Sequence, residues 1–500
     1  MCIKKISASL LLFFLTATLP AQEKFAEYHL SPEQLVTRNV KLLTDDNGNL
    51  LADIACFAGN SRLLLIEGDS PKLIYQDSIK EKKKDDAITA ALKKVQAVRN
   101  LQRLATAFDN GIYSDCYYSG KEESAFFVDV DAVNKTATVT DTVKMGKDEH
   151  IITVLEDSGA VYLLSYLDKS DVIYIHVKKP GSKLRIFEKT IKVSSSVGRR
   201  KKGVPVFSDF FKEKNGESYF VYDNRHPNPS YLSAIKEKIY HFPGKLIFSL
   251  ENYNLQTNLV TLDLKSLTHD YYAVAPPFPF VSDDEPSIRS TSSFLSNDIL
   301  FKTGRHGDIF FISATNIYTG ALYYSFVTHT NKSDSIVKTP FFSSATYSGL
   351  ADGKKKSLNK YLDIATIGII PAGDNLFDIE ISSLYQSMGW GHILLSVATS
   401  VTGTYLINSI PNTIGYSIFL FRQRKVFSIR NTLDISTGKF VGSDTAAHAT
   451  ESWEQKVTAV NKFIEQYEYR EDKAQAVIAG KTIYVYFVEP AEEKLLVYKF

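Results

Sequence analysis

The stretch "AVYLLSYLDKSDVIYIHV", residues 160–177, decides the fold class. It contains two short runs rich in Val, Ile, Leu and Tyr, with the polar residues Asp168 to Asp171 between them. Two such runs around a short polar turn predict a β-hairpin. Asn47-Gly48 marks another hairpin turn near the N-terminus. The hairpin plan recurs in residues 245–264, 298–326, 416–431 and 474–500, the last of which reads as a three-stranded meander.

These repeated units leave no room for the helices that a parallel α/β sheet needs between its strands. A radial array of four-stranded sheets would accommodate a chain of 500 residues in about seven or eight units. From about residue 40 to the C-terminus, the pattern resembles the β-propeller architecture. The resemblance implies an all-β fold of antiparallel meanders. It implies no functional family, because no unit carries a WD, kelch or Asp-box signature.

Residues 85–108 break the strand pattern. Ile88, Leu92, Val95 and Leu101 recur at helical spacing, and aspartates precede them. We therefore expect an amphipathic helix inserted into a single propeller-like domain that spans residues 22–500. The helix would either pack its apolar stripe on the rim of the propeller or bind a partner. A weaker helical pattern covers residues 450–467.

The N-terminal segment has the layout of an export signal. Lys4 and Lys5 precede the apolar run from Leu10 to Leu15, and Leu19-Pro20-Ala21 follows as a cleavage site. The apolar run is too short to cross about 30 Å of hydrocarbon, which takes about 20 helical residues. The sequence therefore predicts a signal peptide over residues 1–21 and no transmembrane segment after its removal.

The same segment predicts the compartment. The predicted cleavage leaves Gln22 as the first mature residue, and no cysteine follows the apolar run until Cys56. We therefore expect an exported protein, periplasmic or extracellular, without a lipid anchor.

The charge balance disfavours nucleic-acid binding. The chain has 58 Lys and Arg against 56 Asp and Glu, and the signal peptide removes Lys4 and Lys5, so the mature chain carries equal numbers of each sign. It lacks the basic excess that attracts polyanions. Three local basic runs read as solvated loop tips or, alternatively, as contacts with an envelope surface: residues 80–84, 199–202 and 354–356.

Two cysteines remain in the mature chain, Cys56 and Cys116. Export makes a disulfide between them chemically permissible, but two separate buried thiols fit the sequence equally well.

Two loops combine histidine with arginine and an acid. "DNRHPNP", residues 223–229, contains Asp223, Arg225 and His226, and "GRHGD", residues 304–308, contains Arg305, His306 and Asp308. A histidine can act as general base, an aspartate as acid, and an arginine can bind a carboxylate with two hydrogen bonds. These residues are also ordinary loop residues, and their spacing matches no catalytic motif.

Aspartates form the second set of candidates. Asp283, Asp284 and Asp374 lie in acidic turns, and glycosidases need two carboxyl groups about 5–10 Å apart. Aspartate also occurs in turns simply because it suits them. Nothing in the sequence indicates a metal or a cofactor: the near-calcium loop at Asp45 has Leu50 where glycine is needed.

Three functions remain open from the sequence. The first is an exported, non-catalytic propeller that binds a protein, peptide or glycan ligand. The second is a structural component of a cell-envelope assembly. The third is a secreted hydrolase, acting on glycans, that uses the loop carboxylates and histidines. Fold alone does not decide between them.

Overall fold

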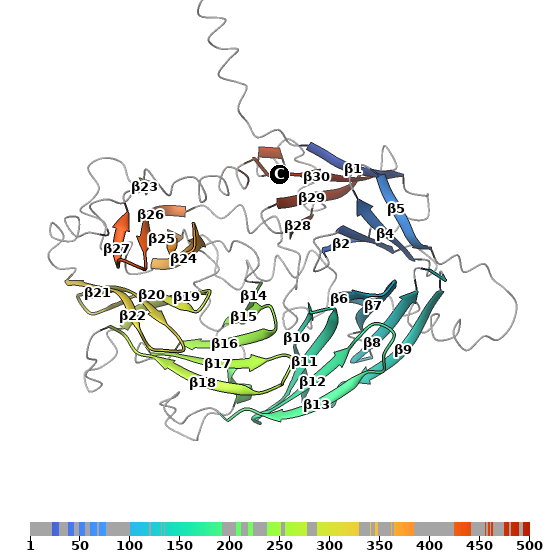
Figure 1. Cartoon of the computed structure of the whole chain (residues 1–500), viewed down its shortest axis with the longest axis horizontal. Helices are drawn as coiled ribbons and strands as arrows, with labels where there is room; N and C mark the ends of the chain where they lie inside the picture. Colours follow the sequence, from blue (N-terminus) through green and yellow to red (C-terminus); the bar gives the residue numbers. More distant parts are fainter. Residues whose placement is uncertain are drawn as a thin grey trace, which may run out of the picture. The chain divides into compact units, whose positions relative to one another are not determined.

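The computed structural model describes the strands of this chain together with most of their tight turns (Figure 1). The described residues are 23–29, 39–44, 50–55, 61–67, 70–76, 101–119, 122–131, 133–134, 136–192, 207–211, 219–223, 238–251, 256–277, 288–329, 341, 346–348, 362, 365–384, 425–441, 456, 459–460, 462–463, 475–479, 482–489 and 494–500. The expected signal peptide, residues 1–21, lies outside them.

The chain divides into two compact units. Unit 1 comprises Met1–Glu81, Ile414–Arg422 and Glu451–Phe500, and unit 2 comprises Lys82–Thr413 and Gln423–Thr450.

The described part of unit 1 contains two antiparallel sheets of four strands. The first has the order β1-β30-β29-β28, so the strand nearest the N-terminus completes a meander formed by the C-terminal strands. The second has the order β2-β3-β4-β5. The strands are β1 (Glu23–His29), β2 (Asn39–Thr44), β3 (Leu50–Ala55), β4 (Ser61–Glu67), β5 (Ser70–Gln76), β28 (Gln475–Ala479), β29 (Thr482–Glu489) and β30 (Lys494–Lys499).

Among its described residues, unit 2 contains five sheets that follow one another along the chain. The first two are β6 (Leu101–Asp109), β7 (Ile112–Ser119), β8 (Ser124–Asp131) and β9 (Thr136–Lys144), and then β10 (Glu149–Asp157), β11 (Ala160–Leu167), β12 (Val172–Lys178) and β13 (Arg185–Thr190). The third is β14 (Phe220–Asp223), β15 (Lys238–Phe242), β16 (Lys245–Glu251), β17 (Thr257–Asp263) and β18 (His269–Val274). The fourth is β19 (Ile288–Ser296), β20 (Ile299–His306), β21 (Ile309–Asn316) and β22 (Leu322–His329).

The fifth sheet of unit 2 is built on β24 (Ala365–Pro371), β25 (Leu376–Leu384) and β26 (Lys425–Asp434). Two short strands share the far edge of β26. β23 (Thr346–Ser348) pairs with residues 428–430, and β27 (Lys439–Val441) pairs with residues 432–434. In the third sheet, β14 pairs with β15 in the parallel direction, whereas the other strand pairs of that sheet are antiparallel.

Two-residue turns set the register of the first hairpins. Asn110 and Gly111 (φ 48° and 82°) connect β6 to β7, and Ser158 and Gly159 (φ 51° and 70°) connect β10 to β11. A positive φ at both central residues matches the turn to the twist of the paired strands. These turns keep sequential strands adjacent, which produces a meander.

Burial decreases from the middle strands to the last strand in the second sheet of unit 2. In the second sheet of unit 2, six of the eight residues of β11 are buried, whereas β13 has no buried residue. The fourth strand of that sheet is therefore an outer edge.

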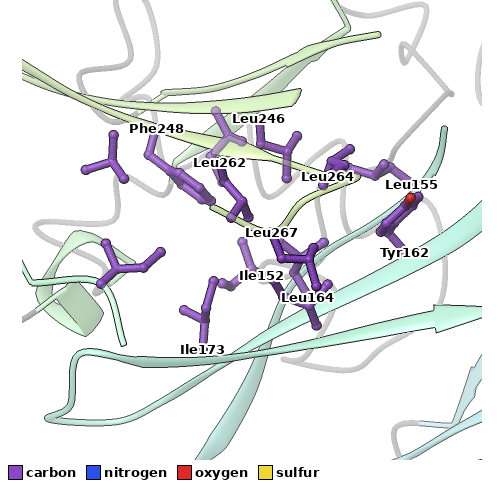
Figure 2. Close-up of a cluster of buried hydrophobic side chains, with 14 of the residues drawn as sticks. Ile152, Leu155, Tyr162, Leu164, Ile173, Leu246, Phe248, Leu262, Leu264 and Leu267 are labelled. Atoms are coloured by element: carbon purple, nitrogen blue, oxygen red, sulfur yellow. The ribbon is translucent and has the colours of Figure 1, made fainter. Parts of the chain in front are cut away.

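Neighbouring sheets of unit 2 pack face to face through their apolar side chains. A large buried cluster joins the β10–β13 sheet to the β14–β18 sheet (Figure 2). Ile152, Leu164 and Ile173 come from one sheet, and Phe248 and Leu262 from the other. The short 3₁₀ helix η3 (Phe207–Phe210) adds aromatic rings to the same cluster.

The packing continues into the following sheets. The Tyr240 and Phe294 ring centroids lie 5.7 Å apart, which joins the third sheet to the fourth. The Phe301 and Phe377 centroids lie 5.0 Å apart, which joins the fourth sheet to the fifth. Each sheet is thus covered by the next, as in the blades of a propeller.

The structure corrects the C-terminal part of the helix that we expect over residues 85–108. Residues 101–109 form strand β6, which pairs with β7 along its whole length. The reason is burial on both faces. Leu104, Ala105, Thr106 and Ala107 are all 6 % exposed or less, and a strand buried on both sides lacks the alternation that distinguishes it from a helix. Residues 85–100 lie outside the described residues.

The described strands confirm the fold class: an all-β chain of antiparallel, mostly four-stranded meanders of the β-propeller type. The part of the chain that the structure describes holds seven such sheets. In the weaker helical pattern over residues 450–467, the few described positions, such as Val460 and Phe463, are helical. No helix among the described residues is long and apolar enough to cross a membrane.

Candidate functional site

The β20–β21 hairpin carries three residues of the predicted site. Arg305 is 9 % exposed, and its Nε donates a hydrogen bond to the carbonyl oxygen of Gly307 at 2.9 Å. The Oδ2 of Asp308 lies 3.1 Å from Nδ1 of His329, at the end of β22, and both side chains are about half exposed. His306 is the last residue of β20. The structure therefore brings Asp308 together with His329, which the sequence did not indicate.

Asp374 lies in the turn between β24 and β25 and is exposed. Its position relative to Asp308 follows from the packing of the two sheets. The rings of Phe301 and Phe377 pack against each other. Phe301 lies close to the β19–β20 turn and Phe377 close to the β24–β25 turn, so these two turns lie at the same end of their sheets. Asp308 lies just beyond the opposite end of β20. Because β20 is eight residues long, its two ends are about 25 Å apart at about 3.3 Å per residue. Asp308 and Asp374 are therefore separated.

The structure shows less about the other predicted site residues. Asp223 is the last residue of β14, opposite His241 in β15. Arg225, His226, Asp283 and Asp284 lie outside the described residues.

Cys116 is fully buried in β7 with a free thiol, and burial raises the pKa of that thiol well above its ordinary value. Cys56 lies outside the described residues, so a disulfide between Cys56 and Cys116 and two separate buried thiols both stay predictions.

A buried histidine joins the β10–β11 turn to the β15–β16 turn. The Nε2 of His241 lies 2.9 Å from Oδ2 of Asp157, and both side chains are 6 % exposed or less. The same oxygen accepts a hydrogen bond from the backbone N–H of Gly244 at 2.8 Å, and Oδ1 accepts one from Ser158 at 2.8 Å. Burial alone would raise the pKa of Asp157, but the hydrogen bonds from His241, Gly244 and Ser158 hold it below its ordinary value.

A buried lysine joins the first two sheets of unit 2. Lys178, at the end of β12, is fully buried, and its Nζ lies 3.0 Å from Asp129 in β8 and 3.5 Å from Asp141 in β9. Asp129 also accepts a hydrogen bond from Ser114 at 2.6 Å. These charged groups connect the two sheets.

A third contact between sheets is open to solvent. Lys245, at the start of β16, donates a hydrogen bond to the Tyr318 hydroxyl at 2.8 Å and lies 3.4 Å from Asp298. Tyr318 also packs edge to face with Tyr272 at 5.1 Å. The Lys245 ammonium lies 5.3 Å from the centroid of Phe242. We call Phe242, Lys245, Tyr272, Asp298 and Tyr318 the aromatic cluster.

The aromatic cluster combines a partly exposed ring with two opposite charges. Tyr318 is 36 % exposed, and the side chains of Lys245 and Asp298 are 31 % and 49 % exposed. Partial burial acts to lower the pKa of Lys245, but the hydrogen bond to Tyr318 and the charge of Asp298 outweigh it and raise the pKa above its ordinary value. The lysine is therefore charged at neutral pH. Such a surface can stack on the apolar face of a ligand ring and form hydrogen bonds with polar groups at the rim of that ring.

The sequence contained a signal for this cluster. Tyr318 belongs to "NIYTG", which forms a turn. Because a turn lacks the alternation of a strand, that alternation does not assign this aromatic side chain to a buried face. The contribution of Lys245 could not be read, because the two residues are 73 positions apart. Among the described residues, no group of three or more His, Cys, Asp or Glu side chains is placed to hold a metal ion.

No protein-family model matches this chain. No curated protein matches it by sequence either.

Solved structures match this chain at low similarity. The SapL1 lectin in complex with alpha methyl fucoside is 10 % identical, with a TM-score of 0.24 over 71 % of this chain and 91 % of that one. A subtype N10 neuraminidase-like protein of A/little yellow-shouldered bat/Guatemala is 9 % identical, with a TM-score of 0.26 over 72 % and 95 %. The WD40 domain of SCAP from fission yeast is 9 % identical, with a TM-score of 0.30 over 96 % and 93 %. The fold assignment rests on the sheet topology.

Proposed function

We propose that this chain is an exported, non-catalytic binding protein in which propeller blades serve as a scaffold for ligand-binding turns. One observation carries the proposal. The turns at one end of the unit 2 sheets present the aromatic cluster to solvent, whereas the neighbouring Asp157–His241 pair is buried in a contact between sheets.

The placement of the predicted catalytic residues supports binding over hydrolysis. Asp308 and Asp374 lie at opposite ends of adjacent sheets, about 25 Å apart by strand length, and a glycosidase needs its two carboxyl groups within about 10 Å. The Asp308–His329 pair is half exposed to water, an environment that does not strengthen electrostatic catalysis.

Export is the second part of the proposal. It rests on the order of basic, apolar and small residues before Gln22. The first described strand, β1, starts at Glu23, so the proposed cleavage would leave this strand intact.

The proposal is tested with the purified chain from residue 22 onward. We expect saturable binding to an immobilised glycan or peptide and no release of nitrophenol from nitrophenyl glycosides. Steady turnover that Asp308→Asn abolishes would contradict the proposal and favour the hydrolase. Glu188→Gln, on the exposed outer strand β13, is the matched control for that variant.

A further inference from the structure

We propose that the aromatic cluster binds a pyranose ring of a neutral glycan. Tyr318 would be the stacking platform, and Asp298 and Lys245 would hydrogen-bond the sugar hydroxyls. This inference rests on the proposed binding function and specifies its ligand class and its site.

The loop that carries Tyr318 is held in place before any ligand arrives. The Oδ1 of Asn316 accepts hydrogen bonds from the backbone N–H groups of Tyr318 at 3.0 Å and of Thr319 at 2.9 Å. The N–H of Gly320 donates to the carbonyl oxygen of Asn316 at 3.0 Å, and Gly320 has a φ of 70°. A preformed loop avoids much of the entropy cost of ordering on binding.

The ring of Tyr318 is also held in orientation. Tyr272 packs against it at an interplanar angle of 82°. The Nζ of Lys245 is hydrogen-bonded to the Tyr318 hydroxyl and lies 5.1 Å from the centroid of the Tyr318 ring. The ammonium therefore lies toward the hydroxyl end of the ring. These contacts fix the ring while leaving 36 % of the residue exposed.

The polar groups beside the ring suit sugar hydroxyls. An ammonium has three donors and a carboxylate has two acceptor oxygens, and the contacts of Lys245 with Tyr318 and Asp298 use only part of that capacity. A pyranose presents an apolar face of C–H groups and a rim of hydroxyls. An aromatic ring flanked by a donor and an acceptor matches both features.

The charge balance of the site favours a neutral sugar. Asp298 lies 3.4 Å from Lys245, so the local charges of opposite sign compensate each other. An acidic sugar would face the Asp298 carboxylate, and a basic one would face the Lys245 ammonium. Neither would gain a net electrostatic attraction.

The test is a microarray of neutral and acidic oligosaccharides, followed by titration calorimetry with the best neutral binder. We expect the chain from residue 22 to bind neutral glycans, and Tyr318→Ala to weaken binding by about tenfold or more. Tyr318→Phe, which keeps the ring, should retain most of the affinity. Tyr323→Ala is the matched control, since Tyr323 is 37 % exposed on β22 and lies outside the aromatic cluster.

Three results would overturn the inference. One is wild-type binding that Tyr318→Ala leaves unchanged, and another is equal loss in Tyr318→Ala and Tyr323→Ala. The third is binding to acidic glycans alone or to no glycan. Each would leave the proposed binding function standing, because that function fails on catalytic turnover or on the absence of any glycan or peptide binding.

Discussion

Glu27, in the strand nearest the N-terminus, forms an ion pair with Lys494, the first residue of the last strand, with 3.5 Å between Oε1 and Nζ. The pair marks a sheet whose edge strand comes from the other end of the chain. Around it, Ala26 is 4 % exposed, and the ring of Phe25 packs on Tyr484 at 5.2 Å. A terminal strand shared in this way joins the two ends of the sequence in one sheet.

The burial of Ala26 gives the first prediction. Ala26→Asp would bury a charge on the covered face of β1 and should lower the free energy of unfolding by several kcal/mol. Urea denaturation followed by circular dichroism measures the loss. Lys24→Gln, on the exposed side of β1, should change stability by less than about 0.5 kcal/mol. Equal, small effects of both variants would show that β1 is not docked.

The buried Lys178 gives the second prediction. Lys178→Ala would leave Asp129 and Asp141 without their buried countercharge and should cost about 3–5 kcal/mol of unfolding free energy. The double variant Lys178→Met with Asp129→Asn should recover part of that loss, because it removes charges of both signs. Urea denaturation measures the unfolding free energies of the two variants. A loss below about 1 kcal/mol in Lys178→Ala would mean that the lysine does not connect the sheets.

The lowered pKa of Asp157 predicts a dependence of stability on pH. The carboxylate is stabilised in the folded state, so its contribution is complete above the unfolded pKa of about 3.8 and is lost as the pH falls through the lower folded pKa. Asp157→Asn should therefore destabilise the protein by about 2–4 kcal/mol at pH 7. The difference from wild type should shrink below about pH 3.8.

Denaturation at pH 7 and at pH 3 measures this difference. Asp270→Asn, on the exposed start of β18, is the control and should show no comparable change. A stability difference for Asp157→Asn that stays constant between the two pH values would contradict a stabilised carboxylate at this position.

The predicted cleavage gives the fourth prediction. If residues 1–21 are an export signal, N-terminal sequencing of the protein from its native cell should begin at Gln22, and fractionation should find it outside the cytoplasm. A chain that still begins at Met1 in the membrane fraction would refute the proposed export.

The hairpins were predictable because each is local in sequence. Residues 160–177 form β11 and most of β12, and the runs in 245–264 and 474–500 form strands close to the expected positions. The alternation of apolar and polar residues and the turn residues that define a hairpin lie within a few positions of one another. The sequence of one short segment is therefore enough to detect them. The strand at 101–109 was missed because burial on both faces removes the alternation.

The site was less predictable because its contacts join different sheets. The order of strands in a meander shows which turns share an end, and this rule could have separated Asp308 from Asp374 before the structure was known. The pairing of Lys245 with Tyr318, and of His241 with Asp157, depends on how one sheet stacks on the next. No local pattern encodes that stacking.

The most direct measurement is a complementation experiment on the terminal strand. Deleting residues 22–30 should lower the melting temperature by 10 °C or more, in keeping with the loss of several kcal/mol, because β30 loses its antiparallel partner. A synthetic peptide of residues 22–30, added in excess, should restore the melting temperature, whereas the same peptide with Ala26→Asp should not. A truncated chain that melts at the wild-type temperature, or one that the peptide leaves unchanged, would contradict the closure of this sheet by the N-terminal strand.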